Sequence, residues 1–413
     1  MFKTLYRCSR TIARHENGPL YESRRKYLEH LAAQGSSLKT LRVAAEVIYR
    51  AAVHMRLDSS TQVEHSEVEH AAKDWATRPY GNGNQIGPER VLKRVRSIVS
   101  GWLRFDGRLH EPNPAPSPHQ AEVDAYCRCM EEEPGLSPAT IATARHHLKH
   151  FFAEIAKRRL TKYAIAHIEQ YLANLGEKGW TRNGIRALAY HVRGFFLYAE
   201  SQRWRKPGLG VLIRGPRIYR RERPPMGPSW PDVQRLLAST ETDCRADIRD
   251  RVILLLLAVY GLRVGEVRRL CLENVDWERR TIAIARTKQG RARICPLIPT
   301  LAAALTRYIR EVRPPTHYRE IFIRLNAPHK PFCHGGMWGI VANRFRRLGI
   351  KSELCGPHSL RHACATHLLA QGFTLTEVGG HLGHSTSEAT LVYAKVDMNA
   401  LRVVANLDLG GLL

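Results

Sequence analysis

Several features that whole classes of proteins need are missing from this chain of 413 residues. The longest apolar run, Val252 to Leu262, is far shorter than the roughly 20 residues of a membrane-spanning helix. The nine cysteines are scattered and form no CxxC pair, which favours a reducing interior over a secreted fold. No internal repeat or low-complexity block occurs. The length therefore predicts two or three ordinary globular domains.

Acidic residues are scarce relative to basic ones. The chain has 38 Asp and Glu against 64 Lys and Arg, a formal net charge of +26, and the basic residues run through its whole length. Such a surface attracts a polyanion. We expect a nucleic acid rather than a membrane, because no segment can span a bilayer. Residues Met1 to His15 are also basic, and we interpret them as an arm that touches DNA rather than as a targeting peptide.

Two segments mark the expected domain boundaries. Residues 110–120 contain HEPNPAPSP, whose four prolines exclude helix and sheet ladders and predict a linker. Residues 205–228 mix many Lys and Arg with Pro and Gly, which predicts a linker along DNA phosphates, with a solvated tether as the alternative. The expected domains are an N-terminal helical DNA-binding arm (1–109), a helical domain (121–204) and a third domain with a tail (229–413).

The first two domains have helical periodicity. Residues 19–56 predict a helical hairpin that is interrupted at Gly35 and resumes at the cap Ser37, and another helix begins near Pro88. Residues 121–204 predict a compact four-helix module, with helix starts at Ser137 and Thr181. The basic residues that we expect on DNA are Arg182, Arg186, Arg193, Arg214, Arg217, Arg220 and Arg221.

The third domain has mixed periodicity. It predicts one long helix over residues 247–270 and two short strands, 281–285 and 292–296, around a turn at Gln289-Gly290. Further helices are expected over residues 299–312, 335–348 and 358–371. The predicted fold class is thus mainly α with a small antiparallel sheet.

Residues with chemical potential follow one another in this third domain. They are Arg263 and Glu266 in YGLRVGEV, Lys288 in TKQGRAR, His358, Arg361 and His362 in PHSLRH, His384 in HLGHS, and Tyr393 in ATLVYAKVD. A site that breaks a phosphodiester needs forked cations on the non-bridging oxygens, an acid for the leaving oxygen and a nucleophile. Two arginines, Lys288 and Tyr393 supply these functions, and a neighbouring His can help Tyr393 lose its proton. The set needs neither metal nor other cofactor.

These motifs resemble the tyrosine recombinases, also called phage integrases. The family pattern is an Arg in a GLR turn, a Lys in a strand hairpin, HxLRH, LGH and a Tyr about nine residues later, and all occur here in order. The resemblance implies that Arg263 and Arg361 clamp the scissile phosphate, Lys288 is the general acid, His358 and His384 manage protons, and Tyr393 is the nucleophile. Glu266 and His362 would support these groups.

The resemblance also implies an architecture and partners. Residues 121–204 would be the family's core-binding (SAM-like) domain and residues 229–413 its α+β catalytic domain. Double-stranded DNA would be bound by a homo- or hetero-oligomer, a tetramer on two duplexes, in the bacterial cytoplasm at the nucleoid. The tail from Asp397 to Leu413 would dock on a neighbouring protomer or fold back on its own domain.

Alternatives remain open at this stage. A type IB topoisomerase shares the chemistry, and a DNA-binding accessory protein could carry these residues without catalysis. Taken singly, Arg263 could only pair with Glu266, and Tyr393 could be one more half-buried aromatic. The pairs His358 with His362 and His381 with His384 have zinc-compatible spacing, but they lack an HExxH motif or a Cys partner. The hairpin residues Arg286, Arg291 and Arg293 compete with Lys288 for the role of general acid.

Overall fold

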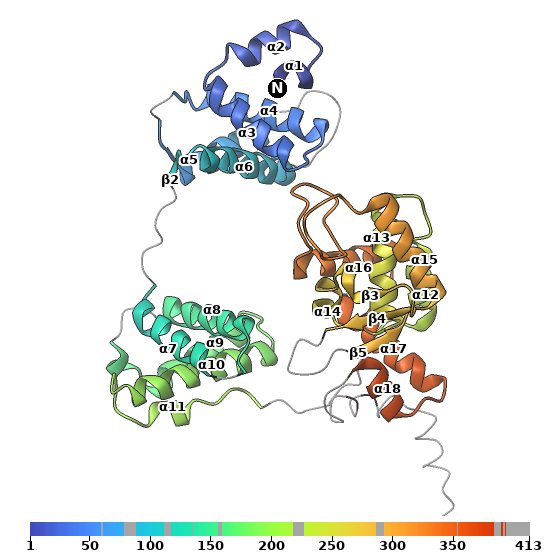
Figure 1. The fold of residues 1–413 in the computed structure, drawn as a ribbon. Coiled ribbons are helices and arrows are strands. Elements are labelled where there is room, and N and C mark those ends of the chain that lie inside the picture. Colours follow the sequence, from blue (N-terminus) through green and yellow to red (C-terminus); the bar gives the residue numbers. More distant parts are fainter. Residues whose placement is uncertain are drawn as a thin grey trace, which may run out of the picture. The chain divides into compact units, whose positions relative to one another are not determined.

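The computed structural model describes residues 1–58, 61–77, 88–110, 117–133, 135–155, 159–217, 227–285, 293–352, 354–383, 390 and 393. These residues are mainly helical, with one three-stranded antiparallel sheet and one short parallel strand pair (Figure 1). The predicted fold class is therefore confirmed. The chain divides into two compact units, one made of residues 1–110 and 223–413 and the other of residues 111–222.

Residues 1–110 have a helical core of their own, built around Leu28, Ile48 and Trp102. The predicted hairpin is confirmed: α3 ends before Gly35, which has a φ of +84, and Ser37 caps α4 by accepting a hydrogen bond from the Thr40 amide. Helix α5 and the parallel pair of β1 and β2 were not predicted. The elements are α1 (Phe2–Leu5), α2 (Ser9–Glu16), α3 (Tyr21–Ala33), α4 (Leu38–His54), β1 (Val63–Glu64), α5 (His65–Thr77), α6 (Pro88–Phe105) and β2 (Leu109–His110).

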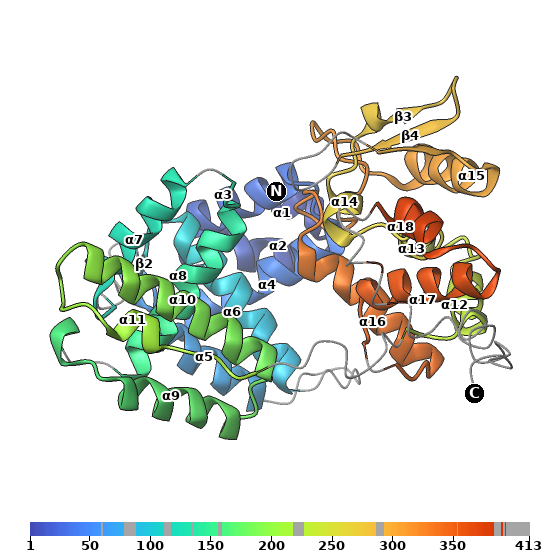
Figure 2. The ribbon, with the colours of Figure 1, turned by 90° about the horizontal axis from the view of Figure 1, so that it is seen from below.

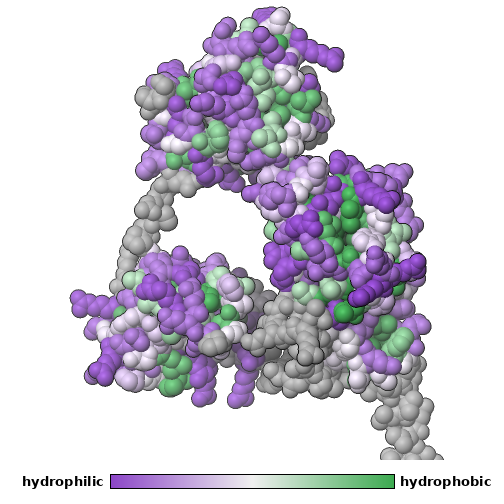
Figure 3. Space-filling view, in the orientation of Figure 1, coloured by the Kyte–Doolittle hydropathy of each residue, from purple (hydrophilic) through white to green (hydrophobic). Residues whose placement is uncertain are grey.

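Residues 111–222 contain the predicted four-helix module. Ser137 and Thr181 each accept a hydrogen bond from the backbone at the start of α8 and α10, as expected. Hydrophilic side chains cover most of the face of this unit drawn in Figure 3. Its elements are α7 (Gln120–Glu132), α8 (Pro138–Glu154), the 3-10 turn η1 (Leu160–Lys162), α9 (Ile165–Glu177), α10 (Arg182–Ser201) and α11 (Leu209–Leu212).

The start of the basic segment after Trp204 corrects one expectation. The sequence predicted a linker over residues 205–228, yet Leu209 and Ile213 are buried in the core of the four-helix module. These apolar residues lie four apart at the start and just after the end of α11, and the Gly210 amide donates to Glu200 at 2.8 Å. The packed module therefore extends to Ile213.

The third domain that the sequence predicts, residues 229–413, contains α12 (Trp230–Ala238), α13 (Arg245–Ala258), α14 (Val264–Arg268), η2 (Leu272–Asn274), β3 (Val275–Asp276), β4 (Thr281–Ile284), β5 (Arg293–Pro296), α15 (Pro299–Arg307), the π-turn η3 (Tyr308–Val312), α16 (His334–Leu348), α17 (Pro357–Ala370) and α18 (Leu375–Leu382). The strands pair antiparallel in the order β3-β4-β5, and Ile282 lies opposite Cys295 on the buried face. The turn predicted at Gln289-Gly290 lies outside the described residues. Strand β3 and helix α18 were not predicted.

One long predicted helix is in fact two. The expectation for residues 247–270 was wrong, because α13 ends at Ala258 and α14 begins only at Val264. Every residue from Val252 to Ala258 is buried, so α13 forms the centre of the core and packs against α15 and α17 (Figures 1 and 2). The break carries the chain from this core to the surface.

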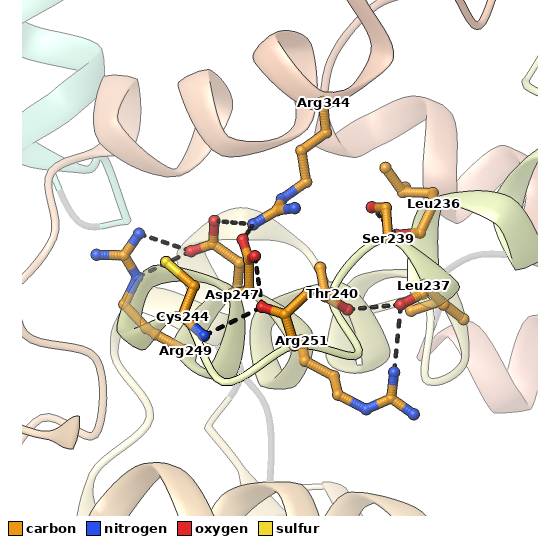
Figure 4. A network of polar contacts seen from close by, with 11 residues as sticks. Leu236, Leu237, Ser239, Thr240, Cys244, Asp247, Arg249, Arg251 and Arg344 are labelled. Carbon is orange, nitrogen blue, oxygen red and sulfur yellow. Dashed lines mark hydrogen bonds and ion pairs between the residues drawn. The ribbon is translucent and has the colours of Figure 1, made fainter. Parts of the chain in front are cut away.

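A network of ion pairs joins α13 to α16. Arg344, only 7% exposed, donates from Nη2 to Asp247 at 2.6 Å and to Asp250 at 2.7 Å (Figure 4). Arg249 adds two hydrogen bonds to the other oxygen of Asp250, at 2.9 and 2.6 Å. Burial alone would lower the pKa of Arg344, but its bonds to both carboxylates raise it instead. The network thus fixes α16 against the first turns of α13.

Removal of the Arg344 guanidinium should destabilise the catalytic domain strongly. Arg344→Met leaves the buried carboxylate of Asp250 and the half-buried carboxylate of Asp247 without their shared cation, and breaking a buried pair in this way typically costs about 3–5 kcal/mol. Urea unfolding of the full chain measures the loss. Arg346→Met is the matched control, because Arg346 is exposed on the same helix and its side chain bonds to the neutral Asn343. Equal unfolding midpoints for the two variants would contradict the prediction.

Candidate active site

The turn between α13 and α14 is built around Gly261. Its φ of +59 lies in the left-handed region that favours glycine, and a Cβ there would collide with Leu382 of α18. The turn places Arg263 at the N-cap of α14. Arg361 of α17 donates a hydrogen bond from Nη1 to the carbonyl oxygen of Gly261. Two arginines from distant parts of the sequence therefore meet at one turn.

Glu266 holds Arg263 at two points. One carboxylate oxygen accepts the Arg263 backbone N–H at 2.8 Å, and the other accepts its Nη1 at 3.0 Å. Glu266 is buried, whereas the Arg263 side chain remains 41% exposed. The ion pair between Arg263 and Glu266 that the sequence analysis considered is therefore present, but Glu266 bonds to only one edge of the Arg263 guanidinium. The remaining N–H groups stay available for an anion.

Arg361 is the buried member of the pair, at 1% exposure. Its Nη2 is buried and has no hydrogen-bond partner among the described residues. Burial, with smaller contributions from the positive charges of Arg263 and Arg293, lowers the pKa of Arg361 to about 10, although Tyr393 and Glu266 act in the opposite sense. A buried cation with an unused donor, beside a second cation, is a site that an oxyanion would stabilise.

Two histidines of α17 lie between the arginines and the tyrosine. The rings of His358 and His362 meet edge to face with centroids 4.4 Å apart, and His362 Nδ1 lies 2.9 Å from the Tyr393 hydroxyl oxygen. His358 as a whole residue is exposed, although its imidazole is partly desolvated. This desolvation, followed by the charges of Arg361 and Arg263, lowers the pKa of His358.

Tyr393 is buried, at 2% exposure, in a small apolar cluster separate from the main core. Its backbone N–H donates to the Thr390 carbonyl, and Gly379 of α18 leaves room for Thr390, since a Cβ there would lie 2.7 Å from the Thr390 hydroxyl. Burial raises the pKa of Tyr393 to about 12, while Arg361 and Arg263 oppose the rise. The ring is therefore enclosed while its hydroxyl faces the charged groups.

The strand hairpin contributes Arg293 at the start of β5. Its guanidinium donates to the carbonyl oxygen of His381, and its charge acts on Arg361. Nε2 of His381 lies 3.0 Å from the Val259 carbonyl oxygen and donates to it. Arg293 is thus the described residue of the hairpin that lies at the site. Lys288, Arg286 and Arg291 lie outside the described residues.

Six of the predicted site residues are described and come together in the catalytic domain: Arg263, Glu266, His358, Arg361, His362 and Tyr393. Lys288 and His384 lie outside the described residues, as do Arg220 and Arg221. Of the predicted DNA contacts in the other unit, Arg182, Arg186, Arg193, Arg214 and Arg217 are all exposed.

Sequence reasoning missed three contributions to the site. It predicted one helix through residues 247–270 and so did not foresee that the Gly261 carbonyl anchors Arg361, and it gave His362 no contact with Tyr393. It also did not foresee that Cys364 would pack beside Tyr393, where burial raises the thiol pKa to about 12 and keeps it neutral. The HxxxH spacing in PHSLRH could have indicated that His362 lies at the site beside His358, since residues four apart share a helix face.

Neither a metal cluster nor a membrane-spanning helix occurs in the part of the chain that the structure describes. The described residues contain no group of three or more His, Cys, Asp or Glu side chains placed to hold a metal ion. Within the same residues, no helix is both long enough and apolar enough to cross a membrane.

Comparison with known proteins agrees with this geometry. The profile of the phage integrase family matches residues 231–400. An integrase/recombinase of Sinorhizobium fredii is 31% identical over 82% of this chain and 82% of that protein, and the tyrosine recombinase XerD of Staphylococcus aureus is 30% identical over 69% of this chain and 97% of that protein. Among solved structures, the Tn1549 transposon integrase in complex with transposon right end DNA has the same fold, with a TM-score of 0.54 and 17% identity over 68% of this chain and 99% of that chain.

The profile match covers the turn of Arg263, the PHSLRH helix and Tyr393, the residues that the fold brings together. The chain therefore belongs to the tyrosine recombinase family, also called the phage integrase family, whose members cleave and rejoin DNA.

Proposed function

We propose that this recombinase cleaves DNA at the site formed by Arg263, Arg361 and Tyr393 and leaves a 3′-phosphotyrosine at Tyr393. One observation carries the proposal. The guanidinium groups of Arg263 and Arg361 lie together at the Gly261 turn, near the hydroxyl of Tyr393, the tyrosine of the family motif. Strand exchange follows when a 5′ hydroxyl from a second duplex attacks the phosphotyrosine. The bond energy is kept in the protein linkage, so the exchange needs neither ATP nor a metal.

The two arginines would share the phosphate. Arg263, fixed by Glu266 on one edge, offers its free edge to one non-bridging oxygen, and the unused Nη2 of Arg361 offers a second donor. Charge-assisted hydrogen bonds from a planar fork neutralise the charge that grows on these oxygens in the transition state. Glu266 acts by orienting Arg263 and does not need to touch DNA.

The remaining groups would transfer protons and orient the phosphate. Lys288 is assigned as the acid for the leaving 5′ oxygen, with Arg293 as the described neighbour that could orient the same phosphate. His358, whose lowered pKa keeps its ring neutral near pH 7, can donate a hydrogen bond to the phosphate. His384 would likewise donate a hydrogen bond to the phosphate, from the side on which Tyr393 lies.

Residues outside the catalytic domain would bind the DNA backbone. We assign residues 1–109 to an N-terminal DNA-binding arm, residues 121–204 to the core-binding domain, residues 205–228 to a basic linker after the Pro-rich linker 110–120, and residues 229–413 to the catalytic domain. The exposed guanidiniums of α10 and of the segment after Ile213 carry the phosphate contacts. They are Arg182, Arg186, Arg193, Arg214 and Arg217, with Arg220 and Arg221 beyond.

The working assembly would be a tetramer on two duplexes, in the bacterial cytoplasm at the nucleoid. The solved relatives include the XerH recombinase bound to its palindromic difH substrate and a lambda integrase dimer bound to a core site. The extra N-terminal arm favours the recombinase of a mobile element over one that resolves chromosome dimers. A two-site recombination assay beside a plasmid relaxation assay separates strand exchange from topoisomerase activity.

Tyr393→Phe should abolish the covalent adduct and leave DNA binding unchanged. The substitution removes only the attacking oxygen from a buried ring. A nicked suicide duplex traps the adduct, and a denaturing gel detects it, while a mobility shift measures binding. An adduct that persists in the Phe variant would show that another residue is the nucleophile.

Arg361→Lys should slow cleavage by about 10²-fold or more, the usual cost of losing a preorganised oxyanion donor. Lys keeps the charge but lacks the fork that bonds the Gly261 carbonyl and the phosphate at once. Single-turnover cleavage of the suicide duplex measures the rate. Arg346→Lys, on an exposed position of α16, serves as the control and should keep the wild-type rate.

Replacing Arg182, Arg186 and Arg193 together by Gln should weaken binding to any duplex and flatten its salt dependence. Each phosphate contact that is lost lowers the slope of log affinity against log salt by about 0.9. Fluorescence anisotropy over a range of salt concentrations gives the slope. Lys178→Gln removes a cation that is already paired with Glu154 and should leave the slope unchanged. An unchanged slope in the triple variant would place the DNA elsewhere.

A further inference from the structure

Of the two neighbouring histidines on α17, it is His362 and not His358 that forms the described contact with the Tyr393 hydroxyl. His362 Nδ1 lies 2.9 Å from the Tyr393 hydroxyl oxygen, and the two ring centroids are 5.5 Å apart. The hydroxyl can donate to this nitrogen only when the nitrogen carries no proton. A neutral His362 with its proton on Nε2 is therefore the form that fits the contact.

The nucleophile needs an acceptor for its proton. With the pKa of Tyr393 at about 12, only about one hydroxyl in 10⁵ is ionised at pH 7. Arg361 and Arg263 favour the phenolate, but they do not overcome the effect of burial. The neutral phenol must therefore lose its proton during the attack, to a group already within hydrogen-bond distance.

The surroundings suit a histidine that becomes positively charged only during the reaction. Among the described residues, the titratable groups near the pair include His358, Arg361 and Cys364 on α17, Arg263 and Glu266 at α14, and Arg293 on β5. His358 and Cys364 both stay neutral near pH 7, because the pKa of the imidazole is lowered and that of the thiol is raised. The arginines oppose a permanent charge on His362, while a phosphate bound between them would offset that opposition.

We propose that His362 is the general base for Tyr393, a role that rests on the proposed function of Tyr393 as nucleophile. As the Tyr393 oxygen forms its bond to phosphorus, its proton passes to His362 Nδ1. The bond from phosphorus to the 5′ oxygen breaks, and the general acid protonates that oxygen. In rejoining, the attacking 5′ hydroxyl loses its proton to the former acid, and His362 returns its proton to the tyrosine oxygen.

Two substitutions separate proton transfer from positioning. His362→Asn keeps a hydrogen-bond acceptor near the position of Nδ1 but cannot take a proton, and His362→Leu removes both capacities. We expect both to slow single-turnover cleavage of the suicide duplex by about 10²-fold. The wild-type rate should rise with pH as His362 loses its proton, and this acidic limb should vanish in both variants. Near-wild-type cleavage by His362→Asn alone would reduce His362 to a positioning role and overturn the proposal.

A more acidic nucleophile provides a second test. Replacement of Tyr393 by 3-fluorotyrosine in the His362→Asn variant should recover about 10-fold in rate, because a more acidic phenol depends less on a base. No recovery would contradict the proposal. His367→Asn, which removes an imidazole from the same helix where it stacks on Trp230, should keep the wild-type rate and pH profile.

The Tyr393→Phe variant keeps this test apart from the proposed function. If that variant still forms the adduct, the assignment of the nucleophile fails. If it forms none, but His362→Asn cleaves with the wild-type rate and pH profile, only the role of His362 fails.

Discussion

The active site depends on holding two arginine side chains next to each other, with the carboxylate of Glu266 bonded to one of them. Arg361 is buried and its pKa falls to about 10, partly because Arg263 lies nearby. Two neutralising contacts make this tolerable: the Gly261 carbonyl accepts from Arg361, and the buried Glu266 accepts from Arg263. Both contacts belong to one turn, which exists because Gly261 adopts a left-handed φ that ends α13. In the proposed function, a phosphate would pair with both guanidinium groups and so offset their mutual repulsion.

The packing of the catalytic domain separates a fixed scaffold from the nucleophile. Helix α13 is buried along its centre, and Arg344 of α16 bonds to its first turns. The helix that leads into the Gly261 turn is therefore held by apolar packing and by ion pairs. Tyr393 belongs instead to a small cluster with Leu369, Val378 and Leu382. Since local opening costs less where fewer apolar contacts must be broken, this cluster should open more readily than the main core. Leu382 of the cluster lies close to Gly261, whose carbonyl anchors Arg361, so a movement of the cluster would also affect the turn.

The sequence was sufficient for the parts of the fold that local rules govern. Ser37, Ser137 and Thr181 cap the helices that they were expected to cap, because a side-chain oxygen satisfies a free amide wherever it occurs. The division of residues 247–270 into two helices was missed, because apolar residues continue through the break and conceal it. The burial of Leu209 and Ile213 was missed for the opposite reason, since the surrounding charges hide two well-spaced apolar residues. The ordered motifs indicated which residues meet, but not that His362 is the one that contacts Tyr393, because that depends on how the last segment packs onto α17.

Charge also explains why the site needs more than its arginines. Burial raises the pKa of Tyr393, while the charges of Arg361 and Arg263 oppose that rise and so favour the phenolate. Once a phosphate lies between them, its negative charge offsets theirs, and the phenol loses that help at the moment when it must attack. The same cations cannot both neutralise the phosphate and ionise the nucleophile. A base that accepts the proton only during the attack would resolve this conflict, and this is the role proposed for His362, whose Nδ1 lies 2.9 Å from the Tyr393 hydroxyl oxygen beside His358.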